Sequence, residues 1–145
     1  MLRESEKRFK HLFENLGDAV YVTKIGGINN GQILEVNPAA IKQTGYSRDE
    51  LLKMSIIKDL YVKGSREILI HDRNDKLNKE ILVKNVEKKR KKDGSEFWTE
   101  VIVTPMEFKG EKASLSIDHD ISNRIYIEKA LRESEERFRS LYENT

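Results

Sequence analysis

The clearest pattern along the chain is a helical spacing of apolar residues that is written twice. Residues 2–15 read LRESEKRFKHLFEN and residues 131–144 read LRESEERFRSLYEN, so ten of fourteen positions match. Apolar residues recur in both copies at alternating steps of three and four, the spacing of a helix that packs along one side. A repeat on both sides of dissimilar sequence predicts one period of a tandem array.

The apolar stripe of each copy defines a possible dimer seam. In the second copy the seam consists of Ile127, Leu131, Phe138 and Leu141, with Ser134 between them, and in the first copy of Leu2, Phe9 and Leu12, with Ser5 between them. One interpretation is that each helix covers its own domain. The interpretation we favour is a helix that leaves one domain, pairs with a second chain and begins the next domain, because short stripes flanked by charge suit helix pairing. We therefore expect a homodimer through the terminal helices.

Between the two copies the pattern changes from helical to extended. Residues 19–25 and 33–36 are rich in β-branched and aromatic side chains, and Asn30-Gly31 between them favours a tight hairpin turn. Asn37-Pro38 then predicts the start of a helix over residues 38–44, because an N-cap side chain precedes a proline at the first helical position.

More short helices are expected next. Ser47-Arg48-Asp49-Glu50 is a capping box, residues 56–61 fit one further turn, and residues 65–73 favour a helix with Ile68 and Leu69 facing inward. Helices this short are not stable alone in water, so we expect them to lie against a sheet.

The second half of the chain supplies most of that sheet. Residues 81–91, 96–108 and 112–121 are extended runs joined by Asp93-Gly94 and Lys109-Gly110, which predicts an antiparallel meander. In the last run the apolar residues Leu115, Ile117 and Ile121 alternate with the polar residues Ser114, Ser116, Asp118 and Asp120. We expect the apolar side to face the core and the polar side to face outward.

This order of elements resembles that of the PAS domain family, and several motifs are similar as well. They are ENLGDAVYVTK, VNPAAIKQTGYSRDELL, DLYVKGSREIL, KKDGSEFWTEVIVTPM and DHDISNRIYIEKAL. The resemblance implies an α+β fold, with a five-stranded antiparallel sheet in the order 2-1-5-4-3, short helices on one face and an amphipathic helix at each end. It also implies three segments: a linker helix over residues 1–16, the PAS domain over 17–122, and a signalling helix over 123–145 that leads into a next repeat.

The function implied by the resemblance is a sensory or relay module of a multidomain signalling protein such as a sensor histidine kinase. The alternative is a ligand-free dimerisation and relay scaffold. The chain itself is not expected to be an enzyme, because it has neither a kinase dimerisation helix nor a glycine-rich phosphate loop. The expected partners are adjacent PAS repeats and an output domain.

Composition narrows the remaining partners. The chain has 27 basic and 25 acidic residues, a net charge of +2, which does not favour a general polyanion binder. Lys88–Lys92 reads KKRKK, but no aromatic residues are interleaved with it, so a solvated strand end is expected and a nucleic-acid site is not. No apolar run is long enough to span a membrane and no signal peptide is evident, so we expect a cytoplasmic fragment without membrane contact.

Cofactor signals are weak. The sequence has no cysteine, which excludes a disulfide and the cysteinyl adduct of flavin photoreceptors. His71 lies where some haem-binding members of the family place an axial ligand, but a single histidine in HDRND favours a solvated surface group. His119 favours a surface or junction contact. The cofactor therefore stays open, with neither haem nor another metal expected.

Two candidate sites remain, a pocket and a junction. The pocket would be lined by Val20, Val22, Leu34, Val36, Ile41, Leu52, Leu60, Leu69, Trp98, Val101, Val103 and Ile117, with Tyr46 nearby. It would either hold a small molecule or be a filled core. The junction is formed by Asp120, Ile121 and Ser122. There Ile121 should be anchored in the core, Ser122 should cap the closing helix, and Asp120 should bond a basic group.

Overall fold

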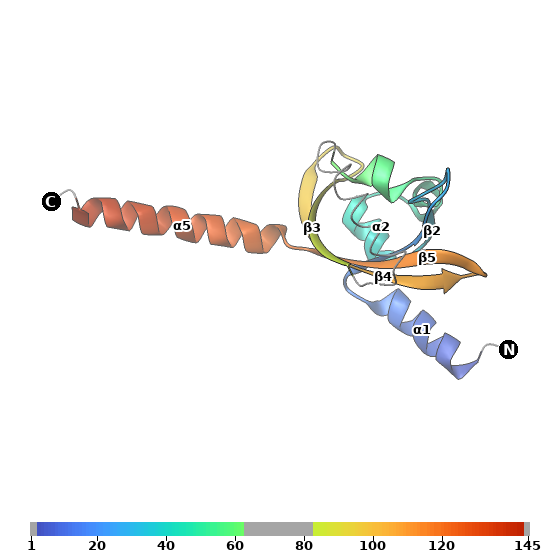
Figure 1. Ribbon diagram of the computed structural model, residues 1–145. Coiled ribbons are helices and arrows are strands. Elements are labelled where there is room, and N and C mark those ends of the chain that lie inside the picture. The colour runs from blue at the N-terminus through green and yellow to red at the C-terminus, as the bar shows by residue number, and fades with distance from the viewer. Residues whose placement is uncertain (1–2, 63–82, 144–145) are drawn as a thin grey trace.

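The structure, a computed structural model, describes residues 3–62 and 83–143 of the chain (Figure 1). Its centre is a five-stranded antiparallel sheet in the order β2-β1-β5-β4-β3. The strands are β1 Ala19–Lys24, β2 Ile33–Val36, β3 Val83–Arg90, β4 Glu96–Phe108 and β5 Glu111–Asp120. The expected sheet and strand order are confirmed, and β1 lies directly beside β5, with Ala19 opposite Asp118 and Lys24 opposite Ala113.

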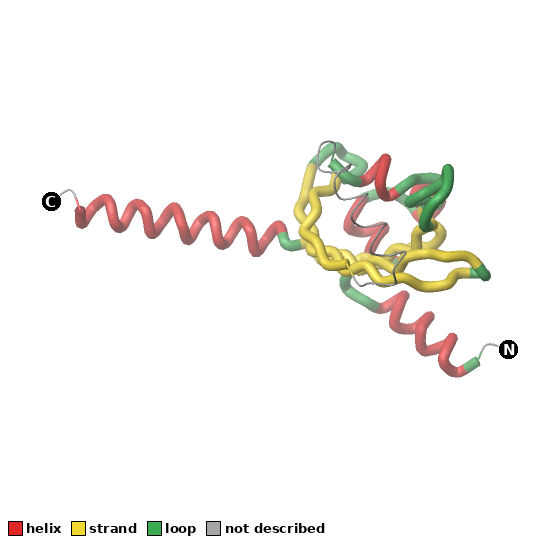
Figure 2. Tube along the Cα trace, viewed as in Figure 1, coloured by secondary structure: helices red, strands yellow, loops and turns green. Residues whose placement is uncertain are grey.

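The helices fall into three places around this sheet. The short elements α2 Pro38–Thr44, α3 Arg48–Leu51 and η1 Ile56–Leu60 lie within the curve of the strands (Figure 2). Helix α1 Glu4–Asn15 lies outside that curve, and α5 Ser122–Glu143 projects away from the domain. We call the surface of the sheet that faces α2, α3 and η1 the inner face, and the opposite surface the outer face.

Local hydrogen bonds hold α2 and α3 where the sequence predicts them. The Asn37 side-chain oxygen accepts from the amides of Ala40 and Val20, and its amide group donates to the Asp18 carbonyl. One buried side chain therefore caps α2 and ties it to β1. The capping box between Ser47 and Glu50 is also present, with both of its hydrogen bonds formed.

The turn between β1 and β2 is longer than the expected two residues and depends on a glycine. Gly31 has a φ of +84°, and a Cβ there would lie 2.7 Å from the Ile57 side chain. Its amide donates to the Lys24 carbonyl, and its carbonyl accepts from the Ile56 amide. A residue with a side chain would be strained at this point, because neither the backbone conformation nor the space admits a Cβ.

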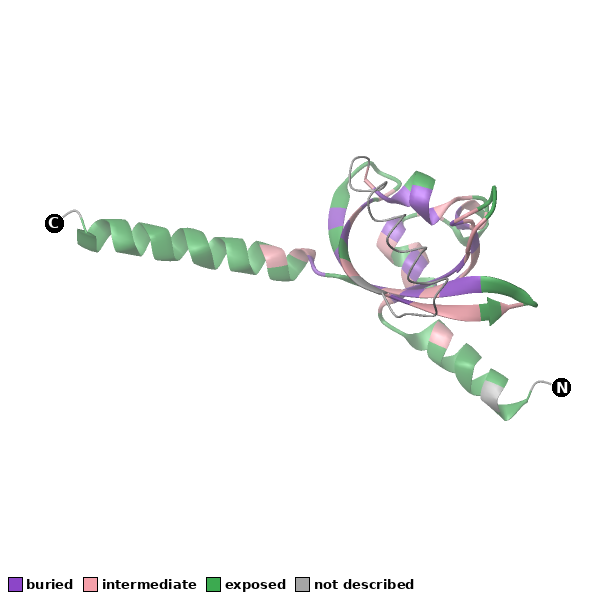
Figure 3. Cartoon of the chain, in the orientation of Figure 1, coloured by how far each residue is buried: buried purple, intermediate pink, exposed green. Residues whose placement is uncertain are grey.

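The core lies between the inner face and the short helices (Figure 3). Its buried residues are Ala19, Tyr21, Ile33, Val36, Ala40, Leu51, Ile56, Ile57, Leu60 and Tyr61. A second, smaller cluster on β4 contains Val101 and Val103.

The orientation expected for β5 is wrong. Ser114, Ser116 and Asp118 are at most 1% exposed and share the inner face with Tyr21, whereas Leu115 and Ile117 are only partly buried. The polar side of this strand therefore faces the core. Burial of those polar groups is tolerated because they have partners there, described below.

Several expectations fall outside the described residues. These are the helix over 65–73 with Leu69 and His71, the first two residues of the run 81–91, and Leu2 of the first seam. Among the helices that are described, none combines the length and apolar character needed to cross a membrane. The described His, Asp and Glu side chains also form no group of three that could hold a metal ion.

Candidate functional site

A buried ion pair is the most unusual feature of the inner face. Lys89 of β3 pairs with Asp118 of β5, and neither side chain is exposed to solvent. The Lys89 ammonium also lies 4.6 Å from the ring centroid of Tyr21 and 5.6 Å from that of Tyr61. A carboxylate and two aromatic faces thus surround the cation, which offsets the loss of its hydration.

Hydrogen bonds extend this pair across β5 and α2. The Ser116 hydroxyl donates to Asp118 Oδ1 at 2.6 Å, and Gln43 Nε2 donates to the Asp118 carbonyl at 3.3 Å. The hydroxyls of Thr23 and Ser114 lie 2.5 Å apart on the neighbouring strands β1 and β5. The buried serine and threonine side chains are therefore bonded within the sheet.

Other polar atoms in this region have no partner. Glu87 lies two residues before Lys89 on the same face of β3 and is 2% exposed. Among the residues that the structure describes, neither of its carboxylate oxygens is hydrogen-bonded, and the same holds for the Tyr21 hydroxyl and Gln43 Oε1. Burial raises the pKa of the Tyr21 phenol because the phenolate would lose its hydration. We call Gln43, Glu87, Lys89, Asp118 and Tyr21 the inner polar cluster.

The sequence analysis missed this cluster. It interpreted Lys88–Lys92 as a solvated strand end, and Lys88 and Arg90 do lie on the outer face, paired with Glu96 at 3.1 Å. Lys89, between them, is fully buried. The available signal was the two-residue period of a strand, which puts Glu87 and Lys89 on one side and Lys88 and Arg90 on the other.

The residues expected to line the pocket are divided between the two faces. Val36 and Leu60 belong to the inner core, Val101 and Val103 form the cluster on β4, and Ile41, Leu52 and Tyr46 pack against the core from its edge. Val20, Val22, Trp98 and Ile117 lie on the outer face, because they alternate with inner-face residues along their strands. They were wrongly expected to line the pocket. Leu34 is partly buried where the pairing of β1 with β2 shifts register, and Leu69 is not described.

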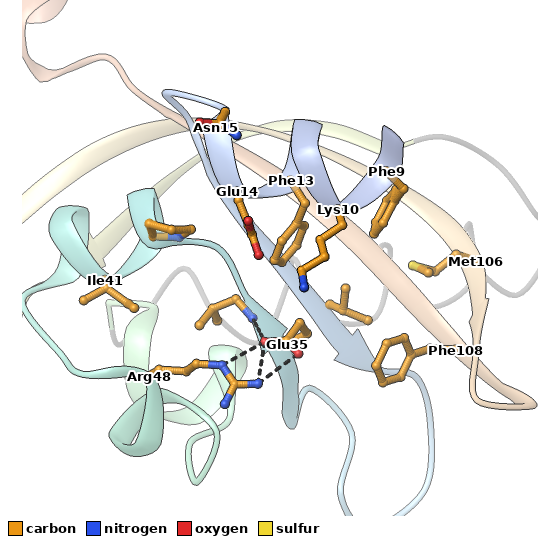
Figure 4. Close-up of a pocket in the computed structure, with 13 residues that line it drawn as sticks. Phe9, Lys10, Phe13, Glu14, Asn15, Glu35, Ile41, Arg48, Met106 and Phe108 are labelled. Atoms are coloured by element: carbon orange, nitrogen blue, oxygen red, sulfur yellow. Dashed lines mark hydrogen bonds and ion pairs between the residues drawn. The ribbon is translucent and has the colours of Figure 1, made fainter. Parts of the chain in front are cut away.

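The outer face carries a groove of about 710 Å³ between α1 and the sheet (Figure 4). Phe9 and Phe13 of α1, with ring centroids 5.8 Å apart, point toward Met106 and Phe108 of β4. Val22 lines the same groove. The first copy of the repeat thus turns Phe9 toward its own domain, which is the alternative interpretation of that seam.

A charged pair closes one side of the groove. Arg48 makes three hydrogen bonds to the Glu35 carboxylate, at 2.9, 2.9 and 3.1 Å. Lys10 and Glu14 of α1 also line this side. The groove therefore has an apolar floor and a charged rim.

The junction into α5 is fixed to the backbone of β4. The Ile121 amide donates to the Trp98 carbonyl at 2.9 Å, and the Trp98 amide donates to the Ser122 hydroxyl at 3.3 Å. Ile121 itself is 3% exposed. Asp120 Oδ1 accepts from the Ser122 amide at 2.9 Å.

The roles of Ser122 and Asp120 differ from those expected. Ser122 bonds β4 instead of capping the helix, and Asp120 accepts from the first amide of α5 instead of binding a basic group. A carboxylate beside the N-terminus of a helix also interacts favourably with the helix dipole. Asp120 therefore acts as the cap.

The second seam lies on a helix that has no buried residue. Ile127, Leu131, Phe138 and Leu141 are each more than half exposed, and Phe138 stacks on Tyr142 with centroids 4.6 Å apart. Within the described part of this single chain, nothing covers the seam.

Comparison with known proteins places the chain in a family context. A family model described as the PAS fold matches residues 7–121. The methyl sulfide methyltransferase-associated sensor of Methanosarcina acetivorans is 29% identical over 145 residues, which is 97% of this chain and 14% of that protein. Sporulation kinase E of Bacillus subtilis is 30% identical over 145 residues, 97% of this chain and 18% of the kinase. The chain spans less than a fifth of either curated relative.

Solved structures agree with the fold. A PAS domain from a two-component sensor histidine kinase is 27% identical, with a TM-score of 0.64 over 81% of this chain and 99% of that one. The PAS domain of a protein from Colwellia psychrerythraea has a TM-score of 0.72 over 83% of this chain and 99% of that one. At 21% identity the second likeness shows the fold alone.

Proposed function

Because the chain belongs to the PAS family, we propose that it is a sensory module that couples the inner polar cluster to helix α5 within a larger signalling protein. The names of its relatives, a sensor and a sporulation kinase, support a role in signalling. Since the chain spans less than a fifth of either relative, a histidine kinase output would lie elsewhere in the parent protein. We place the module in the cytoplasm, where such an output would meet ATP.

The observation that carries the proposal is the course of β5. Asp118, in the inner polar cluster, and Asp120, which caps α5, are two residues apart on this strand and therefore share a face. The next residues bond the backbone of Trp98 on β4. A displacement of Asp118 would shift Asp120 and the start of α5 relative to β4, because a paired strand moves as a unit.

A second candidate is a ligand-free relay in which α5 transmits motion between domains. Two observations favour it: the ion pair already occupies part of the inner face, and the seam on α5 is exposed and suited to pairing with a second copy. Native mass spectrometry of protein purified from several hosts separates the two functions. A reproducible bound mass supports sensing, and an unliganded mass from every host supports the relay.

Amide hydrogen exchange tests the coupling directly. Ser116→Ala removes the hydrogen bond to Asp118 without touching the junction, and it should speed exchange of the Ile121 and Ser122 amides if β5 connects the two. Leu115→Ala, on the outer face of the same strand, is the matched control. Equal effects of the two variants at the junction would contradict the proposal.

The same coupling has a functional test in the parent protein. Asp120→Ala removes the cap at the start of α5, so output should no longer follow the stimulus although the domain still folds. Ser47→Ala, which removes a cap remote from α5, should keep normal regulation. Normal regulation in a folded Asp120→Ala protein would show that the junction is only a turn.

A further inference from the structure

The inner polar cluster lacks hydrogen-bond donors. The buried atoms without a hydrogen bond or ion pair in the described residues are both carboxylate oxygens of Glu87, the Gln43 Oε1 and the Tyr21 hydroxyl. Three of these four atoms can only accept when the carboxyl group is ionised, and the fourth can accept as well. The orientation of the Gln43 amide is fixed by its Nε2, which donates to the Asp118 carbonyl.

The charges in the cluster point the same way. Glu87 and Asp118 each contribute a carboxylate, and Lys89 contributes one ammonium, which is already paired with Asp118. The described cluster therefore carries one more negative than positive charge. A buried carboxylate without a partner is strongly unfavourable, so a group that supplies charge and N–H donors to it would be stabilised there.

From these two observations we infer that the inner polar cluster binds a small organic cation with N–H donors, of the amine or amidine class, through the Glu87 carboxylate. The inference rests on the proposed sensory function and adds the ligand class. Lys89 would not be the anchor, because Asp118 and the two tyrosine rings already surround it. It would instead repel a second cation from the Asp118 side, which leaves Glu87 as the binding carboxylate.

Binding at Glu87 would also have a path to the helix. The backbone carbonyl of Glu87 accepts from the Thr99 hydroxyl at 3.2 Å, and Thr99 lies opposite Asp120 in the pairing of β4 with β5. A ligand that moves Glu87 would therefore act on the strand pair that holds the start of α5.

The test uses n-propylammonium as the probe, with propan-1-ol and propionate as neutral and anionic probes of similar size. In a titration followed by backbone amide NMR shifts, propylammonium should shift the amides around Glu87 and bind at least about tenfold more tightly than the alcohol, the gain of one charge-assisted hydrogen bond. No binding of propylammonium, or equal or tighter binding of propan-1-ol or propionate, would overturn the inference.

Matched variants separate a binding carboxylate from a structural one. Glu87→Gln should weaken propylammonium binding about tenfold and raise the denaturant midpoint of the free protein, because it removes a buried charge that has no partner. Glu107→Gln, an exposed position on β4, should change neither quantity. A Glu87→Gln protein that is less stable and binds the probe unchanged would show that the carboxylate is structural.

The outcomes also distinguish this inference from the proposed function. Propylammonium that binds at Glu87 without shifting the Ile121 and Ser122 amides would support the ligand class and contradict the coupling. A neutral or anionic probe that binds the inner face and shifts those amides would support the coupling and contradict the ligand class.

Discussion

Lys89 on β3 and Asp118 on β5 form an ion pair although β4 lies between their strands. Their backbones are not opposite each other, since Lys89 pairs with Phe97 and Asp118 with Val101. The long lysine side chain spans this offset across the curved inner face. The pair is therefore a consequence of sheet curvature as well as of sequence.

Breaking this pair should be costly. Lys89→Met or Asp118→Asn should lower the free energy of unfolding by about 3–5 kcal/mol, because each leaves the other side chain buried without its partner. The double variant should lose less than the sum of the two. Urea unfolding of all four proteins gives the coupling energy directly.

An exposed ion pair provides the control for that experiment. Arg8 and Glu4 on α1 lie 3.2 Å apart at the surface, so Arg8→Met should change stability by no more than about 0.5 kcal/mol. If the losses at Lys89 and Asp118 add without coupling, the ion pair does not stabilise the fold.

Asn37 should matter more than an ordinary helix cap. Its side chain makes three hydrogen bonds from a fully buried position, to Val20, Ala40 and Asp18. Asn37→Ala should therefore destabilise the protein by more than the about 1 kcal/mol typical of an N-cap. Ser47→Ala, which removes an exposed cap, should give that typical loss, and equal denaturant midpoints for the two variants would contradict the bridging role of Asn37.

Tyr21→Phe should leave the protein as stable or make it more stable. The hydroxyl that is removed is buried and has no hydrogen bond in the described residues, whereas the ring that contacts Lys89 is kept. Removing an unsatisfied buried polar group gains up to about 1–3 kcal/mol. Tyr126→Phe, at a position 73% exposed, should have no effect on thermal unfolding.

A clear loss of stability in Tyr21→Phe would have a different meaning. It would show that the hydroxyl is bonded in solution by a group outside the described residues or by a bound molecule. Comparing the variant before and after exhaustive dialysis would distinguish a bound molecule from a protein group.

The seam on α5 should drive self-association. Burying a large apolar side chain contributes about 1.5–3 kcal/mol, part of which association entropy offsets, so we expect a weak to moderate dimer. Leu131→Asp combined with Phe138→Asp should give a monomer by sedimentation velocity, with unchanged β-sheet circular dichroism. A double variant that sediments like the parent protein would exclude this seam as the interface.

A control on the same helix tests whether charge alone has this effect. Ser140→Asp adds a carboxylate two residues after Phe138, on another side of α5, and should leave the association intact. Phe138→Asp alone should weaken it.

Elements that depend on neighbouring residues could be predicted from the sequence. The Asn37-Pro38 start of α2 and the capping box at Ser47 and Glu50 are satisfied by hydrogen bonds within a few residues, so the pattern alone identified them. The strands and their order followed from two-residue periodicity, turn residues and the resemblance to PAS domains. The apolar stripe of α5 was likewise legible, because a helix sets its own periodicity.

Which side of each strand faces the core was decided by the tertiary structure. The two-residue period shows that Ser114, Ser116 and Asp118 share one face, but it does not say that this face points inward. That direction depends on Lys89, which neutralises Asp118 from a strand that is not its neighbour. Likewise, Asp120 rather than Ser122 caps α5 because the Ser122 hydroxyl accepts from the Trp98 amide of β4, a contact that exists only once the sheet has formed.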